Sequence, residues 1–151
     1  MRTSMSSSNQ SRMLEVQIIV DHSSLSVAEL ESLLMLSADE SWEVGQYYTP
    51  APSASEQQRK FSRWAIREIT SSLDELPKAI NSLTNRISAM EEKFLLLPSD
   101  ARVSLTLFVN ETNTVIGMGL EAETIKLLAK LNADFEMSLL IKNTSGSGLA
   151  V

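Results

Sequence analysis

Apolar and polar residues alternate in five segments of the chain, which is the pattern of strands that bury only one face. These segments are residues 14–20, 61–68, 102–109, 116–120 and 133–141. Between the third and the fourth lies the sequence NETN, which is typical of a hairpin turn. The alternation therefore predicts five strands, two of which are joined directly.

Two short segments between these strands have apolar residues at helical spacing. In residues 26–34, Ser26 and Glu29 have the form of a capping box ahead of the apolar positions. A second short helix is predicted over residues 122–131, and Asn132 suits the left-handed position after its end.

The longest predicted helix begins near residues 72–74, with Asp74 as its cap and Pro77 in its first turn. Its apolar positions recur at spacings of four and three, and Pro98 ends it. These positions are Leu76, Ile80, Leu83, Ile87, Met90, Phe94 and Leu97. We expect this helix to lie on the sheet.

The predicted order β-α-β-α-β-β-α-β favours an α+β fold. Alternating strands are typical of a largely antiparallel sheet with one face toward water, so the helices cover the other face in a two-layer sandwich related to the ferredoxin-like plan. The face toward water is predicted to carry Glu15, Gln17, Ile19, Arg63, Arg67, Ser104, Thr106, Phe108, Glu136, Ser138 and Leu140.

Length and composition indicate one domain and exclude several kinds of chemical site. We predict a single domain over residues 13–143, between a disordered N-terminal segment (1–12) and a flexible tail (144–151). The chain has no cysteine, which excludes disulfides, a thiolate nucleophile and cysteine-ligated metals. No signal peptide or membrane span is recognisable, so we expect a bacterial cytoplasmic protein.

The negative charge is concentrated in the first part of the chain. Residues 1–58 contain two arginines and eight acidic residues, and so account for the whole formal charge of −6. Residues 13–58, called the acidic segment below, contain no lysine or arginine. Such a protein is a poor nucleic-acid binder, whereas a basic partner would be attracted; the alternative is that the acidity only keeps the protein soluble.

One motif resembles a dinucleotide fingerprint without its expected context. Residues 117–122 fit the pattern G-x-G-x-x-A ahead of a helix, and Glu136 lies at a suitable distance to bind a ribose. We reject nucleotide binding because the preceding strand is predicted to belong to a hairpin, and because Glu121 and Glu123 would repel phosphates. The glycines are expected to ease packing at a crowded strand.

No residue set predicts an enzyme. His22, the single histidine, stands between Asp21 and Ser23, but neighbours in sequence cannot converge as a catalytic triad. We interpret it as an ordinary loop histidine. The acidic residues lack the spacing of a calcium loop or of a glycosidase pair, so we expect no metal, no cofactor and no catalytic residue.

The stretch DESWEVGQYY, residues 39–48, contains both acidic and aromatic residues. Trp42 and Val44 are spaced to point the same way, so we expect them to tuck into the core beneath the first helix. The carboxylates around them should point the other way. Gly45 would let the chain turn into a loop that bears Tyr47 and Tyr48.

The runs LSVAELESLLMLSADESWEVGQ, FSRWAI, ARVSLTLFV and IGMGLEAETIKLLAKLNADFEMSLLI resemble a bacterial family known as domain of unknown function 4279. The resemblance covers residues 14–141. Val44 stands where that family commonly has a basic residue, and Asn132 where it commonly has a glycine. The resemblance implies a compact α+β domain and a role as an immunity protein against a toxin; it supplies no catalytic residues.

Our leading hypothesis is a non-enzymatic inhibitor whose acidic surface blocks a basic protein partner such as a toxin. Aromatic anchors would hold the partner and carboxylates would steer it. The predicted partner-binding residues are Glu29, Glu31, Asp39, Glu40, Glu43, Tyr47 and Tyr48.

Two other hypotheses remain open from the sequence. One is a small-molecule or peptide sensor with a pocket between the loop of residues 46–60 and the sheet, with Arg63, Trp64 and Arg67 near its floor. The other is a structural subunit that dimerises through the sheet face or the long helix, so the chain is expected to be a monomer or a homodimer.

Overall fold

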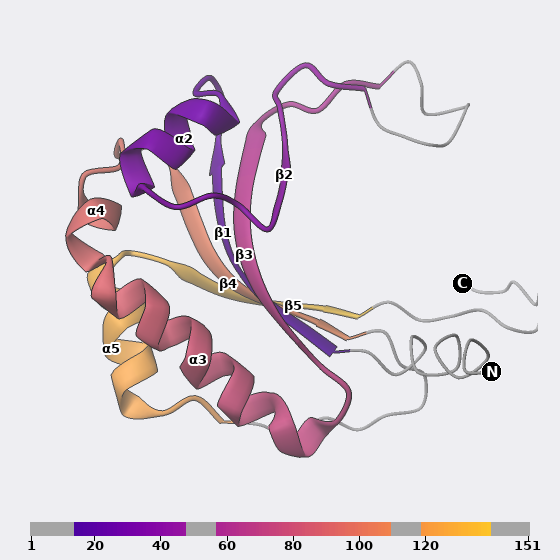
Figure 1. Ribbon diagram of the computed structural model, residues 1–151, viewed down its shortest axis with the longest axis vertical. Helices are drawn as coiled ribbons and strands as arrows, with labels where there is room; N and C mark the ends of the chain where they lie inside the picture. Colours follow the sequence, from indigo (N-terminus) through magenta and orange to yellow (C-terminus); the bar gives the residue numbers. More distant parts are fainter. Residues whose placement is uncertain (1–13, 48–56, 110–118, 140–151) are drawn as a thin grey trace, which may run out of the picture.

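The computed structural model describes residues 14–47, 57–109 and 119–139 (Figure 1). Its strands form one sheet in the order β2-β3-β1-β4-β5. The strands are β1 (Leu14–His22), β2 (Glu40–Trp42), β3 (Ser62–Thr70), β4 (Arg102–Val109) and β5 (Asp134–Leu139). The helices are α2 (Val27–Leu34), the 3-10 turn η2 (Leu73–Glu75), α3 (Leu76–Ala89), α4 (Glu91–Leu95) and α5 (Ala122–Lys130).

The predicted α+β class is confirmed. Strand β1 lies at the centre and pairs antiparallel with both β3 and β4, and β2 pairs antiparallel with β3. Strand β5 pairs with β4 in parallel. This parallel pair follows from the connection, because α5 carries the chain back across the sheet between the two strands.

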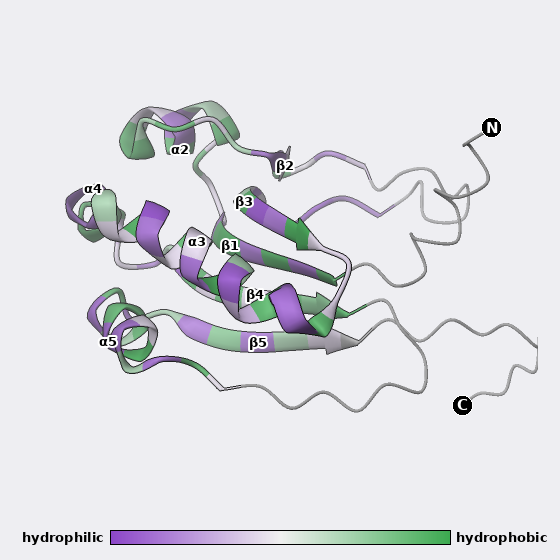
Figure 2. Cartoon of the chain, turned by 60° about the horizontal axis from the view of Figure 1, so that its bottom comes forward, coloured by the Kyte–Doolittle hydropathy of each residue, from purple (hydrophilic) through white to green (hydrophobic). Residues whose placement is uncertain are grey.

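The apolar residues of the strands and helices meet in one core on one side of the sheet. Alternation along β1 sends Val16, Ile18 and Val20 toward the helices. In Figure 2 the bands of colour alternate along the first part of β1, residues 14–18, and Ile19 interrupts the alternation. Trp64 of β3 is fully buried there, with its ring centre 6.0 Å from that of Phe94 in an edge-to-face arrangement. Its Nε1 donates a hydrogen bond to the Leu36 carbonyl at 2.9 Å.

The side chains predicted for the opposite face do lie there, but much of that face is not open to water. We call this side of the sheet the polar face. Gln17, Ile19 and Thr106 are only 2–4% exposed, although no helix among the described residues covers them. Long charged side chains on neighbouring strands pair across this face, as described below. Leu140 lies outside the described residues.

The single long helix predicted over residues 74–97 is wrong, because the chain leaves helical geometry at Met90. Residue 90 has φ −114° and ψ 16°, which separates α3 from α4. The amide groups of Lys93 and Phe94 both bond to the Met90 carbonyl, so a new turn begins there. The bend keeps the apolar stripe on the core side and lets Phe94 reach Trp64. The start also differs: Glu75, not Asp74, occupies the N-cap position of α3, and its side chain makes no capping hydrogen bond.

Both predictions about the ends of the short helices are confirmed. The Ser26 hydroxyl accepts from Glu29 N at 3.0 Å, and the Glu29 carboxylate accepts from Ser26 N at 2.8 Å, which completes the capping box of α2. Asn132, after the end of α5, has φ +55°. Asparagine tolerates this left-handed conformation better than most residues.

Strand β5 is an edge strand, so its inward residues are less buried than the alternation predicts. Phe135 and Met137 stand opposite Leu105 and Leu107 on the helix side, yet they are 41% and 43% exposed. The predicted return strand of residues 116–120 lies mostly outside the described residues. Its last residue, Leu120, is described and packs against the core without forming a strand.

Candidate functional site

The predicted partner-binding carboxylates accept hydrogen bonds from the protein itself. Glu29 binds the backbone at the start of α2, as described above. Glu31 Oε2 accepts from Ala38 N at 2.8 Å and so holds the segment that follows α2. Glu43 lies with both carboxylate oxygens 3.2 Å from Val27 N, at the N-terminus of α2, where the helix dipole favours a negative charge.

The two remaining carboxylates lie at the start of β2 and tie it to its neighbours. Asp39 Oδ2 accepts from Arg67 N of β3 at 2.9 Å. Glu40 Oε1 accepts from Gln17 Nε2 of β1 at 2.8 Å. All five carboxylates are therefore held in place by the fold.

Trp42 lies on the polar face, and the prediction that it tucks into the core beneath the first helix is wrong. The register of β2 pairs Trp42 with Arg63 and Ser41 with Trp64. Because alternate residues face opposite sides of a sheet, Ser41 faces the helices and Trp42 faces away from them. Glu40 shares the face of Trp42, so the prediction that its carboxylate points the other way is also wrong.

The half-buried Trp42 ring is covered by cations. The guanidinium carbon of Arg59 lies 3.7 Å from the ring centre, and that of Arg63 lies 4.6 Å away. Phe61 packs beside it with a ring-centre distance of 6.3 Å. Trp42 Nε1 is buried and has no hydrogen-bond acceptor among the described residues. Two arginines that follow the acidic segment in sequence thus lie against its tryptophan.

The chain on either side of this tryptophan continues as two paired arms. Gly45 N bonds to the Arg59 carbonyl, and Arg59 N bonds to the Gln46 carbonyl, each at 2.8 Å. Tyr47 pairs with Gln58 and is 52% exposed. Gly45, with φ +86°, supplies the left-handed conformation at the bend. Tyr48 lies outside the described residues.

Ion pairs cross the polar face from strand to strand. Arg63 donates from Nε and Nη2 to the two oxygens of Asp21 at 2.7 and 2.8 Å. Arg67 bonds to Glu15 at 3.3 Å, and Glu15 also accepts from Gln17. On the other side of the face, Arg102 contacts Asp134 and Glu136 of β5.

The placement of Trp64 in the sensor pocket predicted from the sequence is wrong. Trp64 cannot lie near the floor of such a pocket, because it is buried on the helix side of β3. Arg63 and Arg67 do lie on the polar face, but each is already paired with a carboxylate. Arg63 and Trp64 are neighbours on one strand and therefore face opposite sides of the sheet.

His22 connects two turns at one end of the sheet. It is 5% exposed, and its Nδ1 accepts from Ser24 N and Leu25 N at 3.0 Å each. Its Nε2 lies 2.9 Å from Asp100 Oδ1. With Nδ1 accepting, Nε2 carries the hydrogen and donates it to Asp100. Both ring nitrogens are occupied in holding the turns together.

The main reason for rejecting the dinucleotide motif is wrong, although a second reason stands. Strands β4 and β5, on either side of the motif, are parallel and are joined through α5. However, Glu121 and Glu123 do lie at the start of α5, where a phosphate would bind. A Cβ atom on Gly119 would meet nothing within 4 Å, so the expected crowding is absent there. Gly117 lies outside the described residues.

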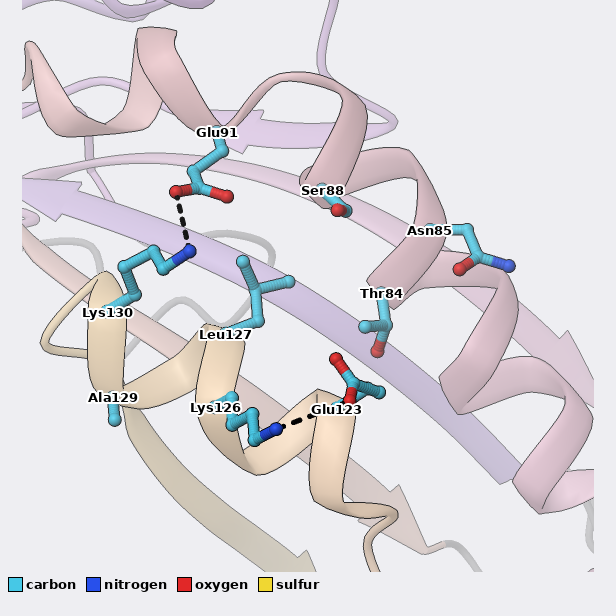
Figure 3. A pocket seen from close by; sticks show the side chains of 9 residues that line it. All are labelled: Thr84, Asn85, Ser88, Glu91, Glu123, Lys126, Leu127, Ala129 and Lys130. Carbon is cyan, nitrogen blue, oxygen red and sulfur yellow. Dashed lines mark ion pairs between the residues drawn. The ribbon is translucent and has the colours of Figure 1, made fainter.

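An open groove of about 740 Å³ runs between α3 and α5 (Figure 3). Its two lysines are paired with glutamates: Lys126 with Glu123 at 3.5 Å, and Lys130 with Glu91 at 3.3 Å. The lining is therefore close to neutral and offers no concentrated charge to a ligand.

Two further features are absent from the part of the chain that the structure describes: a cluster of metal ligands and a membrane-spanning helix. No group of three or more histidine, cysteine or acidic side chains in these residues is placed to hold a metal ion. No helix in the same part of the chain is both long and apolar enough to cross a membrane.

Comparison with known proteins gives a family but no described function. Among curated proteins and solved structures, none matches this chain. The model of the family described as domain of unknown function (DUF4279) matches residues 12–142. This match covers most of the 151 residues and includes every element described above. The chain therefore belongs to the DUF4279 family.

Proposed function

We propose that this protein is a non-enzymatic binding domain, an immunity or antitoxin-like inhibitor that blocks a basic protein partner in the bacterial cytoplasm. The observation that carries this proposal is the acidic segment, which contains no lysine or arginine and whose carboxylates are held in fixed positions. The five carboxylates concerned are Glu29, Glu31, Asp39, Glu40 and Glu43.

These carboxylates can still attract a basic partner although they accept hydrogen bonds from the protein. A carboxylate that accepts from a backbone N–H keeps its full charge, so its long-range attraction for a basic surface remains. Its side chain has also lost its freedom before the partner arrives, which reduces the entropy cost of binding. We expect the acidic segment to raise the association rate more than it slows dissociation.

Aromatic side chains would supply the short-range contacts. Tyr47 is 52% exposed at the end of the acidic segment, and tyrosine is enriched among the residues that dominate interface energies. Trp42 is half-buried under two guanidinium groups, so we assign it a supporting role. Tyr48 belongs to the proposed surface on sequence grounds alone.

The class of function is tested by genetics. The chain is co-expressed with the product of the neighbouring open reading frame in a host that this product poisons. Rescue of growth together with recovery of a complex of the two proteins would support the proposal. Toxicity that persists although both proteins are made and folded would overturn it for that partner.

The proposed electrostatic role of the carboxylates is tested with variants that remove a charge but keep a hydrogen-bond acceptor. Glu29→Gln combined with Glu40→Gln removes two charges and leaves an oxygen acceptor at each position. We expect a slower association with the partner and a weaker dependence of its rate on salt. The control is Glu92→Gln with Glu123→Gln, which makes the same change on α4 and α5. Equal effects in both pairs would show that only net charge matters.

A further inference from the structure

Strand β3 is much longer than the edge strand that covers it. β2 pairs with Arg63, Trp64 and Ala65 only, whereas β3 continues to Thr70. Along residues 67–70 the inner side of β3 pairs with β1, and no described strand lies on its outer side. The outer edge of β3 is therefore open along residues 67–70, beyond the end of β2.

The direction of the backbone groups on this edge follows from the contacts of Asp39. Its N–H bonds to the Ala65 carbonyl, and its carboxylate accepts from Arg67 N. Odd-numbered residues of β3 thus point their N–H and C=O groups outward. The carboxylate of Asp39 takes the place of the next strand carbonyl. The Arg67 carbonyl and both backbone groups of Ile69 come next on the edge, and no described residue bonds to them.

A groove of about 320 Å³ follows the same edge, between β3 and the flank of α3 that faces away from α5. On the α3 side, Ala79 and Ser82 are small, which leaves room for side chains of an added strand. On the strand side, Glu68 faces α3 and accepts a hydrogen bond from Ser82 at 2.9 Å. The side chain of Ile69 is 49% exposed and lies beside the same edge on the polar face. This edge therefore combines free backbone groups, an exposed apolar side chain on the polar face and, on the helix side, a groove with space for further side chains.

The charge at the far end of the groove is negative. Asp74 is exposed and has no ion pair with a described residue, and Glu75 lines the groove beside Thr70. Lys78 offsets Glu75 across 3.7 Å, but both side chains are largely exposed. A strand that runs in line with β2 would begin at this end. A basic residue near its N-terminus would complement Asp74 and Glu75.

We propose that an extended segment of the protein partner adds to β3 as a strand antiparallel to it, in line with β2, with a basic residue next to Asp74 and Glu75. Main-chain hydrogen bonds to Arg67 and Ile69 would bind the segment, and the groove beside α3 would take alternate side chains. This inference rests on the proposed function, because it says where the partner of the inhibitor binds.

The test uses the full chain, labelled with ¹⁵N, and a capped peptide of sequence KVTVTG. We expect amide shift changes at residues 67–71, and hydrogen exchange of the Ile69 amide slowed by about tenfold at saturation. The variant Ile69→Pro removes the outward N–H and leaves the bonds of β3 to β1 in place, as proline allows on an edge strand. It should weaken peptide binding by about tenfold or more, the loss of one hydrogen bond.

The control Ile69→Val keeps the N–H and should bind within about twofold of the original chain, because only one methylene is lost. If Ile69→Pro does not fold, the same binding experiment uses a variant in which two charges are reversed, Asp74→Lys with Glu75→Lys. This variant should also bind the peptide more weakly. Shifts confined to another face, or unchanged binding by the folded proline or reversal variant, would overturn the inference. Peptide binding at this edge without rescue from any toxic neighbour would overturn the proposed function and leave the inference standing.

Discussion

The two tryptophans lie on adjacent strands of one sheet but in opposite environments. Trp64 is fully buried among apolar side chains, and its Nε1 donates to the Leu36 carbonyl. Trp42 is half-buried on the polar face beneath the guanidinium groups of Arg59 and Arg63. Its Nε1 has no acceptor among the described residues.

This difference shows that register, and not residue type, assigns a side chain to a face. Ser41 and Trp42 are neighbours, and a shift of β2 by one residue would exchange their environments. The helix side excludes charge, so each buried polar atom there needs a partner. The polar face uses paired charged side chains as its cover, and it tolerates an indole N–H without an acceptor. The two faces should therefore respond differently to the same substitution.

The largest difference is expected on removing each ring. Trp64→Ala leaves a cavity beside Phe94 in the core and should lower the free energy of unfolding by about 4 kcal/mol. Trp42→Ala removes contacts with two guanidinium groups and should cost about 1–2 kcal/mol. Urea unfolding followed by circular dichroism measures both. Equal losses would mean that the polar face is packed as tightly as the core.

Breaking the ion pair next to Trp42 should come second. Asp21→Ala leaves the Arg63 guanidinium partly buried without its two acceptors, and should cost about 2–3 kcal/mol of unfolding free energy. As a control, Glu123→Ala removes an exposed partner of Lys126 and should cost less than about 0.5 kcal/mol. A loss at Asp21 no larger than this control would show that the cover of the polar face is loose.

His22 tests the rule that buried polar atoms on the helix side are fully paired. His22→Asn places an oxygen near the position of Nδ1 and can still accept from Ser24 and Leu25, so it should cost about 1 kcal/mol. His22→Gln carries its polar group farther out, toward Asp100, and leaves the two N–H donors without an acceptor. It should cost about 2 kcal/mol or more. The reverse order, measured by thermal unfolding, would show that the bond to Asp100 holds the turns.

The α+β class, the faces of β1, β3 and β4, and the caps of α2 and α5 were predictable because each depends on a local pattern. The capping box spans four residues, and the alternation in β1 spans seven. The break at Met90 was not predictable, since the apolar spacing continues through it. It depends on the contact between Phe94 and Trp64, which are thirty positions apart in the sequence.

The candidate site was harder to predict for the same reason. Charge counting located the acidic segment, but the bond from Arg67 N to Asp39 joins residues 28 positions apart and could not be read from it. The open edge of β3 depends on where β2 ends, and β2 has only three residues.

The smallest expected effect is the sharpest test of the comparison between the two rings. Trp42→Phe removes an indole N–H that has no acceptor and keeps an aromatic face for the two guanidinium groups. Its unfolding free energy should change by less than about 0.5 kcal/mol, because no hydrogen bond is lost. The same change at Trp64 removes the bond to Leu36 and leaves part of the ring volume empty, and should cost about 2–3 kcal/mol. A loss of that size at Trp42 as well would mean that its N–H is paired in solution. The polar face would then obey the same rule of complete pairing as the core.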